Sequence, residues 1–156
     1  MSQAQAMSLE EIYQLAFDKL MSAGADEHNA TILSTVLRNA ERDGSHSHGL
    51  FRLPAYVTGL KSKKINGDAR AEVNKITSSF IRVDGNRGLA PTAHDASIPV
   101  LVKAAQKTGV AIAAIHRCFH MAALWPEVEA IAEHGLAGVA AGCELLRLPF
   151  YGEPGR

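Results

Sequence analysis

The sequence predicts an α+β fold in which helices open the chain and a mixed part with short strands follows. Two amphipathic helical segments come before Gly44, whereas segments rich in valine and isoleucine begin only at Glu72. A length of 156 residues and an apolar content of 47% suit a chain that buries a real core. We therefore expect a helical domain over residues 1–66 and a mixed α/β domain over residues 67–156.

The first two helices are predicted from their end signals. Ser8 and Glu11 form a capping-box pattern, and Gly24 provides a stop. Asp26 is placed to cap a second helix, which Gly44 ends. Between these signals apolar residues recur at helical spacing, so we expect two packed helices.

A third helix is predicted over residues 50–60, with Pro54 in its first turn. Beyond a turn-rich stretch, β-type apolar runs alternate with helical periodicity. We expect strands at 72–76, 78–84, 110–115 and 136–141, the first two as a hairpin-like pair, and helices at 93–107 and 124–132. Pro99 predicts a kink in the helix at 93–107 or a late start of that helix.

Charge and targeting features exclude several classes of protein. Sixteen basic residues balance sixteen acidic ones, so we expect neither nucleic acid nor a membrane as a partner. No stretch has the length of a membrane span, and the first residues lack the pattern of a secretory signal. Cys118 and Cys143 are too few for a disulfide framework and are most simply small buried side chains. We expect a cytoplasmic protein.

The densest group of polar side chains is Ser45-His46-Ser47-His48-Gly49-Leu50-Phe51-Arg52. If a helix begins near His48, Arg52 lies four residues on and shares its face. His48 could then donate a proton, Ser47 could orient the imidazole, and Arg52 could hold a carboxylate by two hydrogen bonds. This chemistry suits reduction of a small acid with a C=N or C=O bond beside its carboxylate. The alternative is a helix cap with a surface ion pair.

A second group surrounds the predicted end of the strand at 110–115. Strand alternation would place His116, Cys118 and His120 on one face, as a possible zinc site. We favour a strand end that leads into a helix N-terminus, where free backbone N–H groups at residues 121–123 would bind an anion such as a cofactor phosphate. No G-x-G-x-x-G or P-loop motif occurs, so a nicotinamide site must be built differently from the Rossmann fold.

The segment 42–52, with its S-H-G-x-x-R pattern, resembles the signature of the malate/lactate dehydrogenase type 2 family. Residues 56–65, the Val83-Asp84-Gly85 turn and residues 116–129 follow the same family in order, and the resemblance extends from about Ser8 to Gly142. Within the family, the patterns at 45–52 and 120–126 are most similar to the Δ1-piperideine-2-carboxylate and Δ1-pyrroline-2-carboxylate reductases.

The resemblance implies roles for individual residues. Ser47 belongs to a charge relay, His48 is the proton donor and Arg52 binds the substrate carboxylate. The NADP(H) site, which could take NAD(H) instead, is implied along His120, Met121, Ala122, Ala123 and Leu124. No metal is implied.

The resemblance also implies a fold and a reaction. The cofactor domain has a mainly antiparallel sheet flanked by helices, distinct from the Rossmann fold, and the family forms homodimers. We expect hydride transfer from NADPH to the C=N bond of a cyclic imino acid, which yields proline or pipecolate. Two alternatives stay open: a malate, lactate or ureidoglycolate dehydrogenase that acts on a 2-oxo acid, and a non-catalytic remnant.

The family's chains continue well beyond residue 156, so the resemblance covers only their N-terminal portion. The cofactor domain is then incomplete and lacks the aspartate that completes the relay. Residues 143–151 also depart from the family, which usually has a polar strand end and a glycine-proline loop there. A truncated or frame-shifted gene product would explain both departures and leaves the activity of the short chain open.

Overall fold

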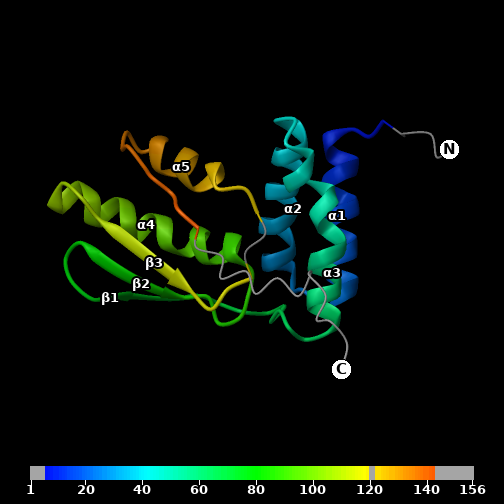
Figure 1. Ribbon diagram of the computed structural model, residues 1–156, viewed down its shortest axis with the longest axis horizontal. Helices are drawn as coiled ribbons and strands as arrows, with labels where there is room; N and C mark the ends of the chain where they lie inside the picture. Colours follow the sequence, from blue (N-terminus) through cyan, green and yellow to red (C-terminus); the bar gives the residue numbers. More distant parts are fainter. Residues whose placement is uncertain (1–5, 120–121, 143–156) are drawn as a thin grey trace, which may run out of the picture.

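The computed structural model describes residues 6–119 and 122–142 (Figure 1). Its elements, in chain order, are α1 (Leu9–Ala23), α2 (Glu27–Arg42), the 3-10 turns η1 (His46–His48) and η2 (Leu50–Arg52), α3 (Leu53–Lys61), β1 (Glu72–Lys75), β2 (Phe80–Asp84), α4 (Ala90–Thr108), β3 (Ile112–His116) and α5 (Trp125–Ala132). Helices α1, α2 and α3 stand together at one end, and the sheet lies at the other with α4 and α5 (Figure 1).

The ends of α1 and α2 follow the predicted signals. The Ser8 side chain accepts a hydrogen bond from the Glu11 N–H, and the Glu11 carboxylate accepts one from the Ser8 N–H at 2.7 Å. Gly24 ends α1 in the left-handed conformation that glycine adopts without a steric penalty. Asp26 caps α2 through the Asn29 N–H at 2.9 Å. Both predicted helices are confirmed.

The three helices enclose an apolar core. The segment that follows α3 then runs along the turn between α1 and α2. The buried Asn29 amide donates to the carbonyls of Gly67 and Ala69, at 2.8 and 3.2 Å. The Asp26 N–H also donates to the Gly67 carbonyl, and Arg70 forms an ion pair with the Asp26 carboxylate at 2.6 Å. The segment that begins the mixed part is therefore held against the helices. The domain division at residue 66 stays a prediction.

The sheet has the order β1-β2-β3, with an antiparallel pairing of β1 to β2 and a parallel pairing of β2 to β3. The antiparallel pair confirms the predicted hairpin. Helix α4 connects β2 to β3 and packs on all three strands, and α5 packs on α4 (Figure 1). Ile81 and Val83 of β2 are fully buried against this helix layer. The α+β class without a Rossmann fold is confirmed.

The start of one predicted helix and the presence of one predicted strand differ from the structure. Helix α4 begins at Ala90 rather than at residue 93, because Pro91 occupies its first turn, where no N–H donor is needed. Pro99 lies inside the helix, so the late start is wrong. Residues 136–141 form no strand; their backbone pairs with none of the described strands, and Gly138 packs against Ile131 of α5. An apolar run identifies a segment that packs, but it does not show that the segment pairs with a strand.

In the described ranges, no helix could cross a bilayer.

Candidate active site

The polar segment at 45–52 folds as two successive 3-10 turns, η1 and η2, and not as the start of a helix. Gly49 separates the turns with an extended ψ of −136°, and α3 begins only at Leu53. The prediction that His48 and Arg52 share one helical face is therefore wrong. The turns instead bring each of these two side chains into contact with Ser47.

Glu41, in the last turn of α2, holds this segment in place. One carboxylate oxygen accepts a hydrogen bond from the Leu50 N–H at 2.7 Å, and the other lies 2.5 Å from His46 Nδ1. The carboxylate occupies the space that a Cβ at Gly49 would need. The Glu41 side chain is only 14% exposed. Sequence reasoning missed this residue, since an acid at a helix end has no distinctive pattern.

The half-buried His48 imidazole makes contacts on two sides. Its Nδ1 lies 3.1 Å from the Ser47 hydroxyl and 3.2 Å from the Ser45 hydroxyl. Its ring packs edge-on against Trp125, with 6.0 Å between centroids and 78° between planes. For Nε2 the described residues provide no hydrogen bond, so this nitrogen remains for another partner. The predicted contact of Ser47 with His48 is present, and Ser45 adds a second one.

Arg52 is joined to the same serine through the backbone. Its Nε donates to the Ser47 carbonyl at 2.8 Å, and its guanidinium carbon lies 5.9 Å from the centroid of the exposed Phe51 ring. Within the described residues, the two terminal guanidinium nitrogens have no partner. These are the nitrogens that bind a carboxylate in two parallel hydrogen bonds. Ser47, His48 and Arg52 thus lie together.

The segment that follows β3 contacts α3 and His48. Phe119 pairs through its backbone with Gly88 and Ala90, at 2.8 and 3.0 Å, and its ring packs edge-on against Tyr56 of α3. Ala122 and Ala123 are buried, and Leu124 then leads into Trp125, which contacts His48. Ala122, Ala123 and Leu124, which were predicted as cofactor residues, therefore directly precede the residue that contacts His48. His120 and Met121 lie outside the described residues.

The predicted helix N-terminus is present, but it begins later than residues 121–123. Helix α5 starts at Trp125, and no side chain caps its first turn. The free backbone N–H groups therefore belong to that turn. The alternation that the zinc hypothesis needs is wrong, because β3 ends at His116 and Arg117 has a φ of 54°. The described residues include no group of three metal ligands. Burial raises the pKa of the Cys118 thiol, so this side chain favours the protonated form.

Trp125 is half-buried. Its ring contacts His48, and its indole lies close enough to the Asp43 carboxylate to affect the pKa of that group. Arg42, which forms an ion pair with Asp43 at 2.7 Å, lowers the pKa of that carboxyl, and the indole lowers it further. Trp125, at the start of α5, thus lies beside His48 and near the end of α2.

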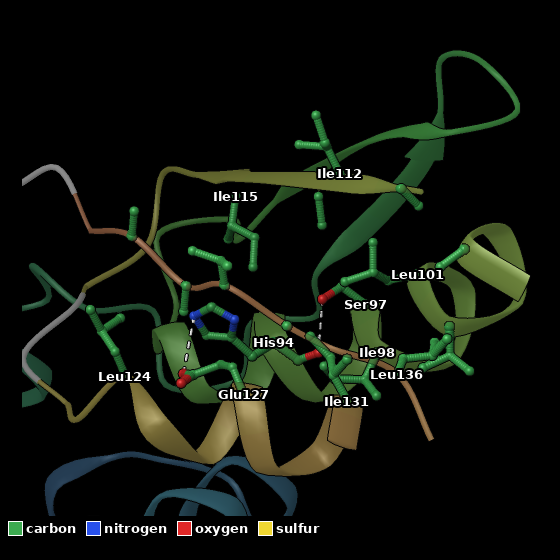
Figure 2. A pocket seen from close by; sticks show the side chains of 18 of the residues that line it. His94, Ser97, Ile98, Leu101, Ile112, Ile115, Leu124, Glu127, Ile131 and Leu136 are labelled. Carbon is green, nitrogen blue, oxygen red and sulfur yellow. Dashed lines mark hydrogen bonds and ion pairs between the residues drawn. The ribbon is translucent and has the colours of Figure 1, made fainter. Parts of the chain in front are cut away.

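A cavity of about 800 Å³ lies between α4, α5, β3 and residues 136–142 (Figure 2). Most of its lining is apolar, but His94 and Glu127, which both line it, point toward each other and lie 3.3 Å apart (Figure 2). Burial raises the pKa of Glu127, and its Oε2 has no hydrogen-bond partner in the described structure. Of the predicted cofactor residues that the structure describes, Leu124 alone lines the cavity. Sequence reasoning missed the His94–Glu127 pair, since no spacing pattern connects α4 to α5.

One known family matches most of the chain. The model of the malate/L-lactate dehydrogenase family matches residues 7–147. The chain belongs to this family. The resemblance inferred from the sequence is confirmed.

Relatives within the malate/L-lactate dehydrogenase family include reductases of cyclic imino acids. Δ1-pyrroline-2-carboxylate reductase 1 of Burkholderia ambifaria is 40% identical over 134 residues, which cover 86% of this chain and 39% of the relative. The Δ1-pyrroline-2-carboxylate/Δ1-piperideine-2-carboxylate reductase of Pseudomonas putida is 39% identical over 132 residues, which cover 85% of this chain and 38% of the relative. This family member thus spans about two fifths of the length of the curated relatives it matches.

Solved structures agree with the family assignment. The crystal structure of Δ1-piperideine-2-carboxylate reductase from Pseudomonas syringae superposes with a TM-score of 0.79 at 39% identity, over 85% of this chain and 40% of that one. The malate/L-lactate dehydrogenase family and these reductases are oxidoreductases, as the resemblance implied. Dehydrogenases of this kind use nicotinamide cofactors, which supports NAD(P) in general.

Proposed function

We propose that this chain supplies the proton donor and the carboxylate-binding group of a reductase that acts on Δ1-pyrroline-2-carboxylate or Δ1-piperideine-2-carboxylate. The observation that carries the proposal is the meeting of His48 and Arg52 at Ser47. The Ser47 hydroxyl contacts His48 Nδ1, and the Ser47 carbonyl accepts from Arg52 Nε. One residue thereby sets the relative position of an acid and a cation. The products are proline and pipecolate.

The imidazole of His48 is oriented for proton donation through Nε2. In the protonated ring, the Nδ1–H donates to the hydroxyls of Ser45 and Ser47, which leaves the Nε2–H for the substrate nitrogen. A bound nicotinamide supplies the hydride for the C=N carbon. The His48 proton is transferred to the imine nitrogen, the C=N double bond becomes a single bond, and the imidazole is left neutral.

Arg52 is suited to bind the carboxylate that both substrates carry beside the C=N bond. Because its Nε is occupied by the Ser47 carbonyl, the two terminal nitrogens are left as a planar pair of donors for a ligand. A carboxylate bound there places the adjacent C=N group at a fixed distance from the guanidinium. His48, attached to the same serine, then lies near the imine nitrogen.

The proposed cofactor is NADP(H), held along His120, Met121, Ala122, Ala123 and Leu124. The described part of this segment fits such a group, because small side chains precede an uncapped helix start beside His48. The N–H groups of that turn suit a phosphate. Titration with NADPH and with NADH, followed through Trp125 emission, tests this site. A non-catalytic remnant would show no saturable change with either cofactor.

The activity test compares this chain with a version extended to the full length of its relatives. NADPH oxidation is followed at saturating Δ1-pyrroline-2-carboxylate, together with His48→Ala in the extended form. We expect turnover by the extended form and a loss of at least about 100-fold for the variant, with cofactor binding retained. No turnover by a folded, cofactor-binding extended form would remove the proposed reaction.

A 2-oxo acid is the second candidate substrate, and the matching family model, which is that of malate and L-lactate dehydrogenases, favours it. The same acid and the same cation would serve a ketone beside a carboxylate. Rates with pyruvate, oxaloacetate and the cyclic imines, measured in one assay, separate the two. The homodimer that the resemblance implies stays a prediction, which light scattering tests. The cytoplasmic location expected from the cysteine content and the lack of a secretory signal also stays a prediction, which cell fractionation tests.

A further inference from the structure

The first turn of α5 touches the candidate site through Trp125. The indole meets the His48 ring edge-on, with 6.0 Å between centroids, and lies close enough to the Asp43 carboxylate to lower the pKa of that group. Asp43 is the C-cap residue of α2, and His48 closes η1. The indole therefore spans the two ends of the segment that carries the proton donor.

The opposite side of the same turn is held by α4. Glu127 lies two residues beyond Trp125, which places its side chain about 200° around the helix. Its carboxylate meets His94 Nε2 at 3.3 Å inside the cavity, and its side chain is only 8% exposed (Figure 2). A buried polar side chain is costly to move away from its partner in either protonation state. Pro126, between the two residues, restricts the backbone of the turn. Trp125 therefore projects from a rigid support.

The contacts at Nδ1 do not fix the tilt of the His48 ring. Hydroxyls at 3.1 and 3.2 Å select the nitrogen that faces Ser47 and Ser45, but hydroxyls rotate and tolerate a tilt of the imidazole. A ring packed edge-on against another aromatic ring resists such a tilt. Trp125 provides this contact, and the tilt decides where Nε2 points.

We propose that Trp125 is a positioning residue that sets the direction of His48 Nε2, and that the Glu127–His94 pair holds Trp125 in place. The consequence for catalysis rests on the proposed reductase function. The contact itself does not, and it can be measured on the chain without substrate or cofactor. From the usual strength of an aromatic pair we expect Trp125→Ala to lower kcat of the extended reductase about 3- to 10-fold, with KM little changed.

The test uses the emission of Trp125, the single tryptophan of the sequence. A protonated imidazole in contact with an indole quenches its fluorescence, so emission should rise as the pH is raised from 5 to 8, the range in which imidazoles titrate. Asp43 stays ionised over this range because Arg42 and the indole lower its pKa. The rise should disappear in His48→Gln. It should remain in His46→Gln, because His46 is 74% exposed and contacts Glu41 instead.

Glu127→Gln, which keeps the volume of the side chain, tests the support. We expect its pH-dependent change in emission to be at most about half that of the wild type, with an unchanged far-UV circular dichroism spectrum. An emission that does not change with pH, or that changes equally in His48→Gln, would overturn the positioning role while leaving the proposed reaction standing. If the extended chain shows no turnover but the emission change is present, the proposed reaction is wrong and the contact between Trp125 and His48 still stands.

Discussion

Replacement of Gly49 by alanine tests how Glu41 organises the candidate site. The new Cβ would overlap the Glu41 carboxylate, so the carboxylate must move. It then loses the Leu50 N–H at 2.7 Å and the His46 ring at 2.5 Å. A hydrogen bond to a charged group contributes about 1.5–3 kcal/mol, and the partial exposure of this pair places the expected loss near 2 kcal/mol.

The matched background is Glu41→Ala, in which the carboxylate is absent. There Gly49→Ala should cost less than about 0.5 kcal/mol, because no side chain has to move and the unfolded chain loses entropy. Urea unfolding followed by far-UV circular dichroism gives the four free energies of the cycle. We expect a coupling of about 1–2 kcal/mol between the two positions. Equal costs of the glycine change in both backgrounds would refute the claim that this contact shapes the loop.

Three further outcomes follow from the structure. Burial raises the pKa of Glu127, so the folded state keeps this proton to higher pH than the unfolded state. The free energy of unfolding should therefore fall as pH rises between the two pKa values. Glu127→Gln should remove that slope in a pH series of urea titrations. Burial works against ionisation of Asp26, but the Asn29 N–H and Arg70 outweigh it and lower its pKa. The stabilisation that Asp26 contributes should be present above its unfolded pKa and be lost as pH falls through its folded pKa. Asp26→Asn, which keeps the cap, should reduce this fall of the free energy of unfolding at acidic pH. In the extended reductase, Arg52→Lys keeps the charge but loses the planar pair of donors, so KM for the imino acid should rise about tenfold; an unchanged KM would argue against carboxylate binding at this residue.

The local elements of this protein could be predicted because their signals are local. Ser8, Gly24 and Asp26 act on backbone groups within a few residues of themselves, and the structure places caps at all three. The same holds for the antiparallel hairpin. The prediction failed where a nearby feature overrode the pattern, as at Gly49, which separates two 3-10 turns where a continuous helix was expected.

The candidate site shows the same division. The sequence by itself determined which side chains gather at 45–52, because neighbours in the chain cannot lie far apart. Only the tertiary structure decided that Trp125 meets His48 and that Glu127 meets His94. Hydrophobic periodicity shows which face of a helix is buried, but the partner of that face depends on how all the elements pack together. Contacts between elements far apart in the chain have no spacing pattern, and these contacts support the proposed proton donor.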